Sequence, residues 1–444
     1  MSDDTQAGFR RELGLLDTAV VVAGAIIGVG IFANPANVAR ILQHPSLILL
    51  AWALGGALAM LGGFAYAELG SRHPVVGGQY SYLARAWHPV IAFLYGVALL
   101  FIINGGALAA VAIVFASYLD RSFVPLGEWG IRAAGAAALI GLTAIQALGI
   151  RTGKWTNNLL MAAKVGGILL LIGMALLGGG APASRFDPAG LFASERPLGG
   201  LLLTALVPIM FAYGGWQNCS FIAGEIKDPG RTLARANVLG VAAVVALYLG
   251  LNVAYLWMLT PEQMGASTAV AADMARAVAG DRGARLVAAL IVISSLGFLS
   301  VVILTGPRLY YAMAQDGLLF RRAGTLHPRY RTPTFTLWLQ TGVALVLLMS
   351  NTYDQLLSYV VFADWLFFGL TVAALFVFRR RDPRPAGAAL MPGHPWTTGL
   401  FVLTALGIVL NSFIAYTTQS LIGSAILLIA AVGYLVVFRR RGAA

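Results

Sequence analysis

The sequence predicts an all-α integral membrane protein with twelve transmembrane helices. Of its residues, 59% are hydrophobic and only 11% are charged, and the mean hydropathy is +0.80. A soluble domain is about half apolar and about a quarter charged. The apolar residues form runs of the length that crosses a bilayer, and basic residues gather in every second loop. These observations exclude a soluble globular fold.

Twelve apolar runs are predicted to cross the membrane and are numbered spans 1 to 12 in chain order. A helical span needs about 20 mainly apolar residues. No cleavable signal peptide is expected, because the first run is too long for the apolar segment of one. The runs cover residues 15–41, 45–70, 88–119, 132–149, 156–179, 200–224, 236–260, 286–315, 334–350, 355–378, 397–418 and 420–438.

Basic residues indicate how the spans are oriented. The formal net charge is +12, and Lys and Arg concentrate before span 1 and after the even-numbered spans, as in Arg379, Arg380 and Arg381. The positive-inside rule places these loops and both termini in the cytoplasm. We therefore expect a multi-pass protein of the cell inner (cytoplasmic) membrane. The charge is interpreted as a topology signal, so no nucleic-acid partner is expected.

Spans 1 and 6 share an interruption near mid-depth. Glycines break the apolar run in "GAIIGVGIF" at 24–32 and again in "FAYGGWQN" at 211–218. Span 1 starts inside and span 6 starts outside, so the two halves have opposite orientations, which is the sequence sign of an inverted repeat. The predicted units are a first repeat of spans 1–5 at 1–180, a second repeat of spans 6–10 at 181–380, and spans 11 and 12 with a basic tail at 381–444.

The two interruptions predict a ligand site at the middle of the membrane. Backbone groups freed from a helix in hydrocarbon are costly, so they are tolerated where they line a cavity. The N-terminus of a half-helix suits a carboxylate, and a half-helix C-terminus offers carbonyl groups that suit an ammonium group. Two such breaks side by side fit an α-amino acid. The alternative interpretation of Gly24 and Gly28 is close packing of helices through small residues.

Taken together, these motifs resemble those of the amino acid–polyamine–organocation superfamily, and "FAYGGW" resembles its L-amino-acid transporter branch. The similarity covers about residues 15–380 in order and spacing. The resemblance implies twelve helices, of which the first ten form the 5+5 inverted repeat of the bacterial leucine transporter. The further motifs that carry it are "AYAELGSRHPVVGGQYSYL" at 65–83, "FAYGGWQNCSFIAGEIKDPGRTLARA" at 211–236, "SSLGFLSVVILTGPRLYYAMAQDGLLF" at 294–320 and "RTP" at 331–333.

The resemblance also implies which residues bind the substrate. Its carboxylate is expected at Val29 and Gly30, at the start of the outer half of span 1. Many relatives have a small polar residue where this chain has Val29, so one hydroxyl contact is lost. The ammonium is expected at backbone carbonyls of both breaks, and aromatic residues of span 6 are expected to shape the pocket. The expected set is Ile26, Gly28, Val29, Gly30, Phe211, Tyr213, Gly214 and Trp216; for Tyr213, packing within the span is an equal alternative.

Lys164 lies nine or ten residues into span 5. This places it near the centre of a hydrocarbon core about 30 Å thick, where a lysine is costly and usually functional. In related sodium-coupled carriers a sodium ion lies between spans 1, 5 and 8. The resemblance implies that the Lys164 ammonium replaces it, in contact with the carbonyl of Gly24 and the hydroxyl of Ser294 or Ser295. Sodium independence is expected, with the lysine either carrying a coupled proton or acting as a structural tether.

Two further polar residues within spans are candidates for selectivity. Asp364 of span 10 either faces the pocket and favours a cationic substrate, or belongs to the scaffold or an outer vestibule. Asn104 of span 3 has the same alternatives. Glu68 and Glu225, at the inner ends of spans 2 and 6, are expected to pair with cytoplasmic arginines.

The expected function is secondary active transport of amino acids by alternating access, through proton symport or amino-acid exchange. The alternatives are a polyamine or cationic amino-acid antiporter and, from another class, a channel-like pore. All five histidines lie in loops or at span ends, so no metal site, cofactor or enzymatic activity is expected. The expected partners are an amino acid substrate and the lipid bilayer, and the sequence does not indicate an oligomeric state.

Overall fold

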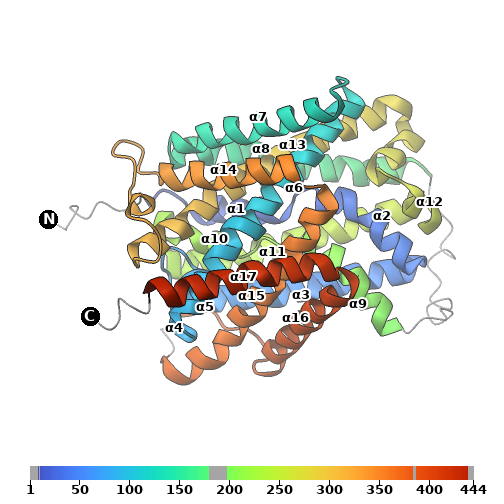
Figure 1. The fold of residues 1–444 in the computed structure, drawn as a ribbon. Coiled ribbons are helices and arrows are strands. Elements are labelled where there is room, and N and C mark those ends of the chain that lie inside the picture. Colours follow the sequence, from blue (N-terminus) through green and yellow to red (C-terminus); the bar gives the residue numbers. More distant parts are fainter. Residues whose placement is uncertain (1–8, 10, 180–197, 384–386, 439–444) are drawn as a thin grey trace.

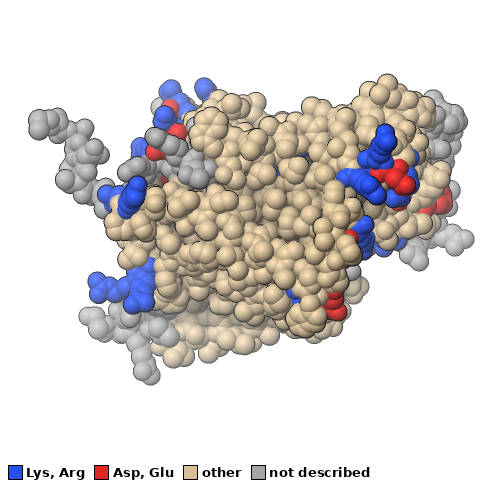
Figure 2. All heavy atoms as spheres, turned by 90° about the horizontal axis from the view of Figure 1, so that it is seen from above, with Lys and Arg blue, Asp and Glu red and all other residues tan. Residues whose placement is uncertain are grey.

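The computed structural model describes residues 9, 11–179, 198–383 and 387–438. Helices of this part of the chain run between two ends of the molecule, and the chain enters and leaves at the same end (Figure 1). Figure 2 shows charged side chains at the two ends of the visible face and an uncharged band between them. This distribution suits a protein that crosses a bilayer, because its central surface contacts hydrocarbon.

The helices follow the predicted spans in order. Those of spans 1 to 5 are α1 (Leu15–Ile26), α2 (Gly30–Leu42), α3 (Pro45–Arg72), α4 (Gln79–Ala86), α5 (Pro89–Ala98), η1 (Leu99–Ile103), α6 (Asn104–Ser122), α7 (Gly127–Ala147) and α8 (Ile150–Leu177). The later ones are α9 (Leu198–Tyr213), α10 (Asn218–Phe221), η4 (Ala223–Glu225), α11 (Pro229–Met258), α12 (Pro261–Ala266), α13 (Val270–Gln315), η5 (Arg321–Gly324), α14 (Thr334–Ser350), α15 (Tyr353–Arg381), α16 (Trp396–Ala415) and α17 (Thr417–Phe438).

Each predicted span corresponds to helix in the described residues, but not all of these helices are long. Nine are long and apolar enough to cross a membrane, and the bent pair α1 and α2 makes a tenth. Helices α9 and α14 are apolar but have only 16 and 17 residues. An all-helical membrane protein is therefore confirmed, while the count of twelve spans and the 5+5 inverted repeat stay predictions.

Two features of the helices differ from the sequence interpretation. Residues 261–284 fall between predicted spans 7 and 8, where the sequence predicts no spanning helix, but they contain α12 and the first part of α13. Helix α13 has non-helical dihedral angles at Ala279 and Gly280, where Gly280 takes a φ of 61°. Glycine adopts this conformation without a steric penalty, so two helices join there with a kink. The boundary predicted between the two repeats, at residues 180 and 181, lies outside the described residues, as do residues 439–444 of the basic tail.

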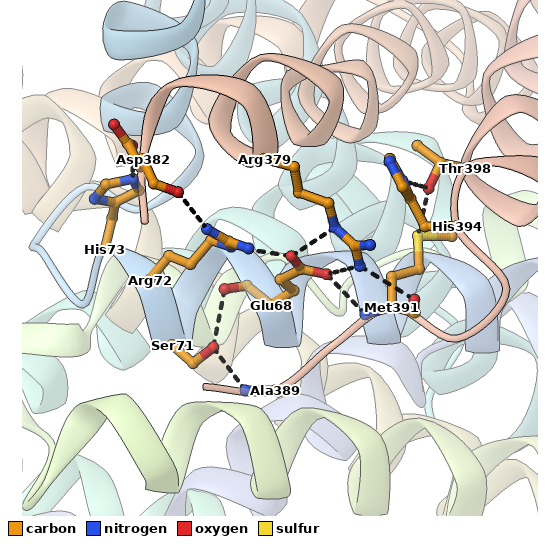
Figure 3. A network of polar contacts seen from close by, with 10 residues as sticks. All are labelled: Glu68, Ser71, Arg72, His73, Arg379, Asp382, Ala389, Met391, His394 and Thr398. Carbon is orange, nitrogen blue, oxygen red and sulfur yellow. Dashed lines mark hydrogen bonds and ion pairs between the residues drawn. The ribbon is translucent and has the colours of Figure 1, made fainter. Parts of the chain in front are cut away.

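A charged network joins α3, the end of α15 and the segment before α16 (Figure 3). The Glu68 carboxylate is fully buried and accepts hydrogen bonds from Arg72 Nε at 2.9 Å and from Arg379 Nη2 at 2.6 Å. The backbone N–H of Met391 donates a further bond to it at 2.7 Å. As the sequence indicates, Glu68 pairs with basic residues at the end where the chain enters and leaves, and it fixes three segments there.

His73 extends this network. Its Nδ1 lies 3.2 Å from Arg85 Nη1, so this nitrogen accepts, and Nε2 donates to Asp382 Oδ2 at 3.1 Å. Burial, helped by the Arg85 charge, lowers the pKa of His73 below its usual value. The ring is therefore mainly neutral at pH 7, and its contact with Asp382 is a hydrogen bond rather than an ion pair.

Replacing Glu68 with alanine is expected to destabilise the protein markedly. Both arginines and the Met391 N–H lose their acceptor, and breaking a buried ion pair costs about 3–5 kcal/mol. Thermal unfolding of the purified protein in detergent measures the effect. The matched control is Glu128→Ala, because the Glu128 side chain is 81% exposed and pairs only with Arg132 of its own helix. Equal unfolding temperatures for Glu68→Ala and the wild type would contradict the role of the network.

Candidate functional site

Both predicted interruptions are breaks in the structure. Helix α1 ends at Ile26 and α2 begins at Gly30, with a bend of 40° between them. Helix α9 ends at Tyr213, and α10 begins at Asn218. A break releases backbone N–H and carbonyl groups from their intrahelical partners, so four helix ends meet here.

The two breaks touch each other through their backbones. A Cβ atom on Gly30 would lie 2.7 Å from the Cα atom of Ala212, and one on Gly215 would lie 2.4 Å from the carbonyl oxygen of Ala25. Gly215 also has a φ of 127°, which side chains rarely allow. Glycine is therefore required at both positions for the broken segments to lie side by side.

A central cavity lies between the breaks and helices α6, α13 and α15. Its wall includes Gly30, the first residue of α2, so the half-helix presents its N-terminal turn and the positive end of its dipole there. The last turn of α9 contributes Phe211, where carbonyl groups lack intrahelical partners. Of the residues expected from the sequence, the cavity is lined by Ile26, Gly28, Val29, Gly30, Phe211, Gly214, Asn104 and Asp364.

Tyr213 and Trp216 do not line the central cavity. The Tyr213 hydroxyl donates to the carbonyl of Trp52 at 3.3 Å. This contact agrees with the alternative prediction, in which Tyr213 packs within the span. Trp216 is fully buried, with its ring 5.0 Å from that of Phe368, and a Cβ atom on Gly62 would lie 2.8 Å from it. The Trp216 ring therefore packs against α3, where Gly62 leaves room, and not on the wall of the cavity.

Lys164 of α8 contacts the end of α1. Its Nζ donates hydrogen bonds to the carbonyl oxygens of Gly24 at 3.0 Å and Ile27 at 2.5 Å. The residue is only 2% exposed, and a Cβ atom on Gly297 of α13 would lie 2.3 Å from Lys164 Cε. The ammonium therefore compensates two carbonyl groups that the first break leaves without helical partners, between spans 1, 5 and 8.

The expected contact between Lys164 and a serine hydroxyl is not found. Ser295 donates instead to the carbonyl of Ile291 on its own helix at 2.7 Å. Ser294 Oγ is buried without a hydrogen-bond partner. The break extends beyond Ile26, so the Ile27 carbonyl takes the place that the serine was expected to fill.

Other polar groups at the breaks were missed from the sequence. At the second break, Gln217 Oε1 accepts from the Gly215 N–H at 3.1 Å, and Asn218 Nδ2 donates to the Gly215 carbonyl at 3.0 Å. At the first, the Tyr248 hydroxyl donates to the carbonyl of Ile26 at 3.0 Å. One lone pair of the Ile26 carbonyl is therefore already occupied. The two amides that follow the glycine pair and Trp216 in "GGWQN" were the available signal for the second break.

Two polar residues on other helices complete the wall of the cavity. Asn104 begins α6 directly after the π-helical turn η1, and its Nδ2 lies 3.4 Å from Gln340 Oε1. Such π-helical turns occur frequently at functional sites. Asp364 lies on α15, and its Oδ1 is buried without a hydrogen-bond partner.

The segment after the second break is held by a buried ion pair. Arg308 of α13 donates to Glu225 Oε1 through Nη2 at 3.0 Å and through Nε at 3.2 Å. The Glu225 carbonyl also accepts the N–H groups of Glu12 and Leu13, both at 3.0 Å. The sequence predicted that Glu225 pairs with an arginine of a cytoplasmic loop. In the structure it pairs instead with Arg308, which lies within span 8.

Comparisons with known proteins agree with this arrangement. Residues 13–437 match the family model described as amino acid permease. The chain is 30% identical to human b(0,+)-type amino acid transporter 1 over 380 residues, which are 83% of this chain and 76% of that one. It is 29% identical to the serine/threonine exchanger SteT of Bacillus subtilis over 398 residues, 88% of each chain. Identity to human large neutral amino acids transporter small subunit 2 is 29% over 380 residues, 84% of this chain and 71% of that one. The chain therefore belongs to the amino acid permease family of the amino acid–polyamine–organocation superfamily.

Proposed function

We propose that this protein is a secondary active transporter that moves amino acids across the cytoplasmic membrane by alternating access. The observation that carries the proposal is the meeting of two half-helix ends of opposite polarity at one cavity. The α2 N-terminus at Gly30 suits the α-carboxylate, and the carbonyls near Phe211 at the α9 C-terminus suit the α-ammonium. The relatives named as amino acid transporters or exchangers support the same substrate class.

We further propose that transport does not need sodium. The Lys164 ammonium occupies the position between α1, α8 and α13 where a metal cation would meet carbonyl oxygens, and it bonds those of Gly24 and Ile27. A fixed cation removes the need for a mobile one. The driving force is then a proton gradient or a counter-substrate on the opposite side.

The proposed orientation places the end where the chain enters and leaves in the cytoplasm. Glu68 and its arginine partners lie at this end (Figure 3). The neighbouring loops carry the excess of Lys and Arg that the positive-inside rule assigns to the cytoplasm.

Purified protein in liposomes tests these proposals together. Uptake of labelled cationic, neutral and acidic L-amino acids is measured in sodium and in choline buffers of equal ionic strength, against protein-free liposomes. Uptake of at least one class is expected to exceed the blank and to be equal in the two buffers. Loading the liposomes with unlabelled amino acid identifies exchange, and an inward proton gradient identifies symport. A several-fold loss of uptake in choline would contradict sodium independence, and no uptake of any class would contradict the transport function.

A further inference from the structure

Asp364 is the only side chain with a formal charge on the wall of the central cavity, within the described part of the chain. It lies on one face of α15 together with Val360, Val361, Trp365 and Phe368. These positions, spaced by one, three and four residues, share a helix face. The carboxyl group is therefore surrounded on its own helix by apolar side chains that give it no hydrogen bond.

Within the described residues, no partner compensates the charge of this carboxyl group. Oδ1 is buried without a hydrogen-bond partner, and no ion pair of the described residues includes Asp364. The buried basic side chains of the described residues are engaged elsewhere: Lys164 with carbonyls of the first break, and Arg308 with Glu225. A buried carboxylate without a partner is unfavourable unless a cation compensates it or a proton neutralises it.

We propose that Asp364 determines specificity by binding the positively charged side chain of the substrate, so that the transported amino acids carry a terminal ammonium or guanidinium group. This inference rests on the proposed function, in which backbone groups of the two breaks hold the α-carboxylate and α-ammonium. Those groups are common to all amino acids and cannot distinguish one side chain from another. Asp364 faces the same cavity and adds one negative charge that a cationic side chain compensates and a neutral one leaves unpaired.

A pair of isosteric ligands isolates this charge. L-citrulline has the shape of L-arginine without its charge, and L-norleucine is L-lysine without its terminal amine. Equilibrium binding of the four compounds to the purified full-length protein in detergent at pH 7 gives two affinity ratios. The cationic member of each pair is expected to bind at least about tenfold more tightly, because the neutral member leaves the Asp364 charge buried and unpaired. In Asp364→Asn, both ratios are expected to fall to about one.

The control variant is Glu128→Gln, which removes a carboxylate from an exposed position on α7 and is expected to leave both ratios unchanged. Thermal unfolding shows whether Asp364→Asn is folded, and wild-type ratios near one overturn the proposal even if it is not. Wild-type ratios near one, with citrulline and norleucine bound, would overturn the inference while sparing the proposed function. An equal loss of affinity for both members of a pair in Asp364→Asn would also overturn it, because the aspartate would then serve the α-ammonium. Absence of binding by all four compounds would also overturn the inference, and the proposed function would then be decided by the liposome assay, which includes neutral and acidic amino acids.

Discussion

Lys164→Ala is expected to lower net transport by at least about tenfold. The substitution removes the ammonium that bonds the Gly24 and Ile27 carbonyls at the end of α1. Each buried acceptor left unsatisfied costs about 1–3 kcal/mol, and no bulk water is available at mid-membrane to replace the lost bonds. The first break then loses the group that fixes its carbonyls, and the wall of the central cavity loses its defined shape.

Two modes of uptake show what the lysine does beyond holding the break. If the ammonium carries the coupled proton, net uptake by Lys164→Ala loses its pH dependence, while exchange of substrate for substrate partly survives. If the lysine is a structural tether alone, both modes fall together and the residual activity keeps the pH profile of the wild type. Initial rates between pH 5.5 and 8.5, with and without internal amino acid, separate the two outcomes.

The control for this substitution is Lys227→Ala. Lys227 is exposed, and the hydrogen bond that ties it to Leu13 comes from its backbone N–H, which alanine retains. It is expected to transport at the wild-type rate. Full activity and an unchanged pH profile of Lys164→Ala in both modes would refute the tether and the proton-carrier interpretations alike.

The positions of the helices and of their breaks could be predicted from the sequence wherever one local property of the chain determines them. Apolar length defines a span, and the glycines of both predicted interruptions lie at breaks, whereas the pair Gly55 and Gly56 lies within the continuous helix α3. The depth of Lys164 followed from counting residues along span 5. The boundary of span 8 could not be found this way, because Gly280 joins a helix that carries Asp273 and Arg276 to an apolar one without a loop.

The directions of individual side chains at the site were harder to predict, because they depend on neighbours distant in sequence. The Trp216 ring packs where Gly62 of α3 leaves space, and nothing in "FAYGGWQN" indicates that glycine. In the same way, the second acceptor for Lys164 is Ile27 because α1 ends at Ile26. A serine of α13 was equally consistent with the sequence. The residues that line the cavity from the breaks could be predicted because backbone geometry, rather than side-chain packing, places them.

A single added methyl group at Gly30 is expected to weaken amino acid binding by at least about tenfold. The Cβ atom of Gly30→Ala would lie 2.7 Å from the Ala212 Cα and 3.0 Å from its Cβ. Backbone atoms cannot rotate away as a flexible side chain can, so α2 and α9 must move apart. That movement separates the N-terminus proposed to hold the α-carboxylate from the carbonyls proposed to hold the α-ammonium. Equilibrium binding and thermal unfolding of the purified variant measure the two consequences.

Comparison with two other glycines shows whether this close approach is the cause. Gly141 of α7 has no atom within 4 Å of an added Cβ, so Gly141→Ala is expected to bind normally. In Gly215→Ala the new Cβ would lie 2.4 Å from the Ala25 carbonyl oxygen, and the effect is expected to match that of Gly30→Ala.

Gly30→Leu adds bulk to the same contact as Gly30→Ala and is expected to abolish binding. Loss of affinity in Gly30→Ala with unchanged thermal stability would mean that the methyl group obstructs the carboxylate without moving the helices. Wild-type affinity in Gly30→Ala would refute the placement of the substrate at these breaks.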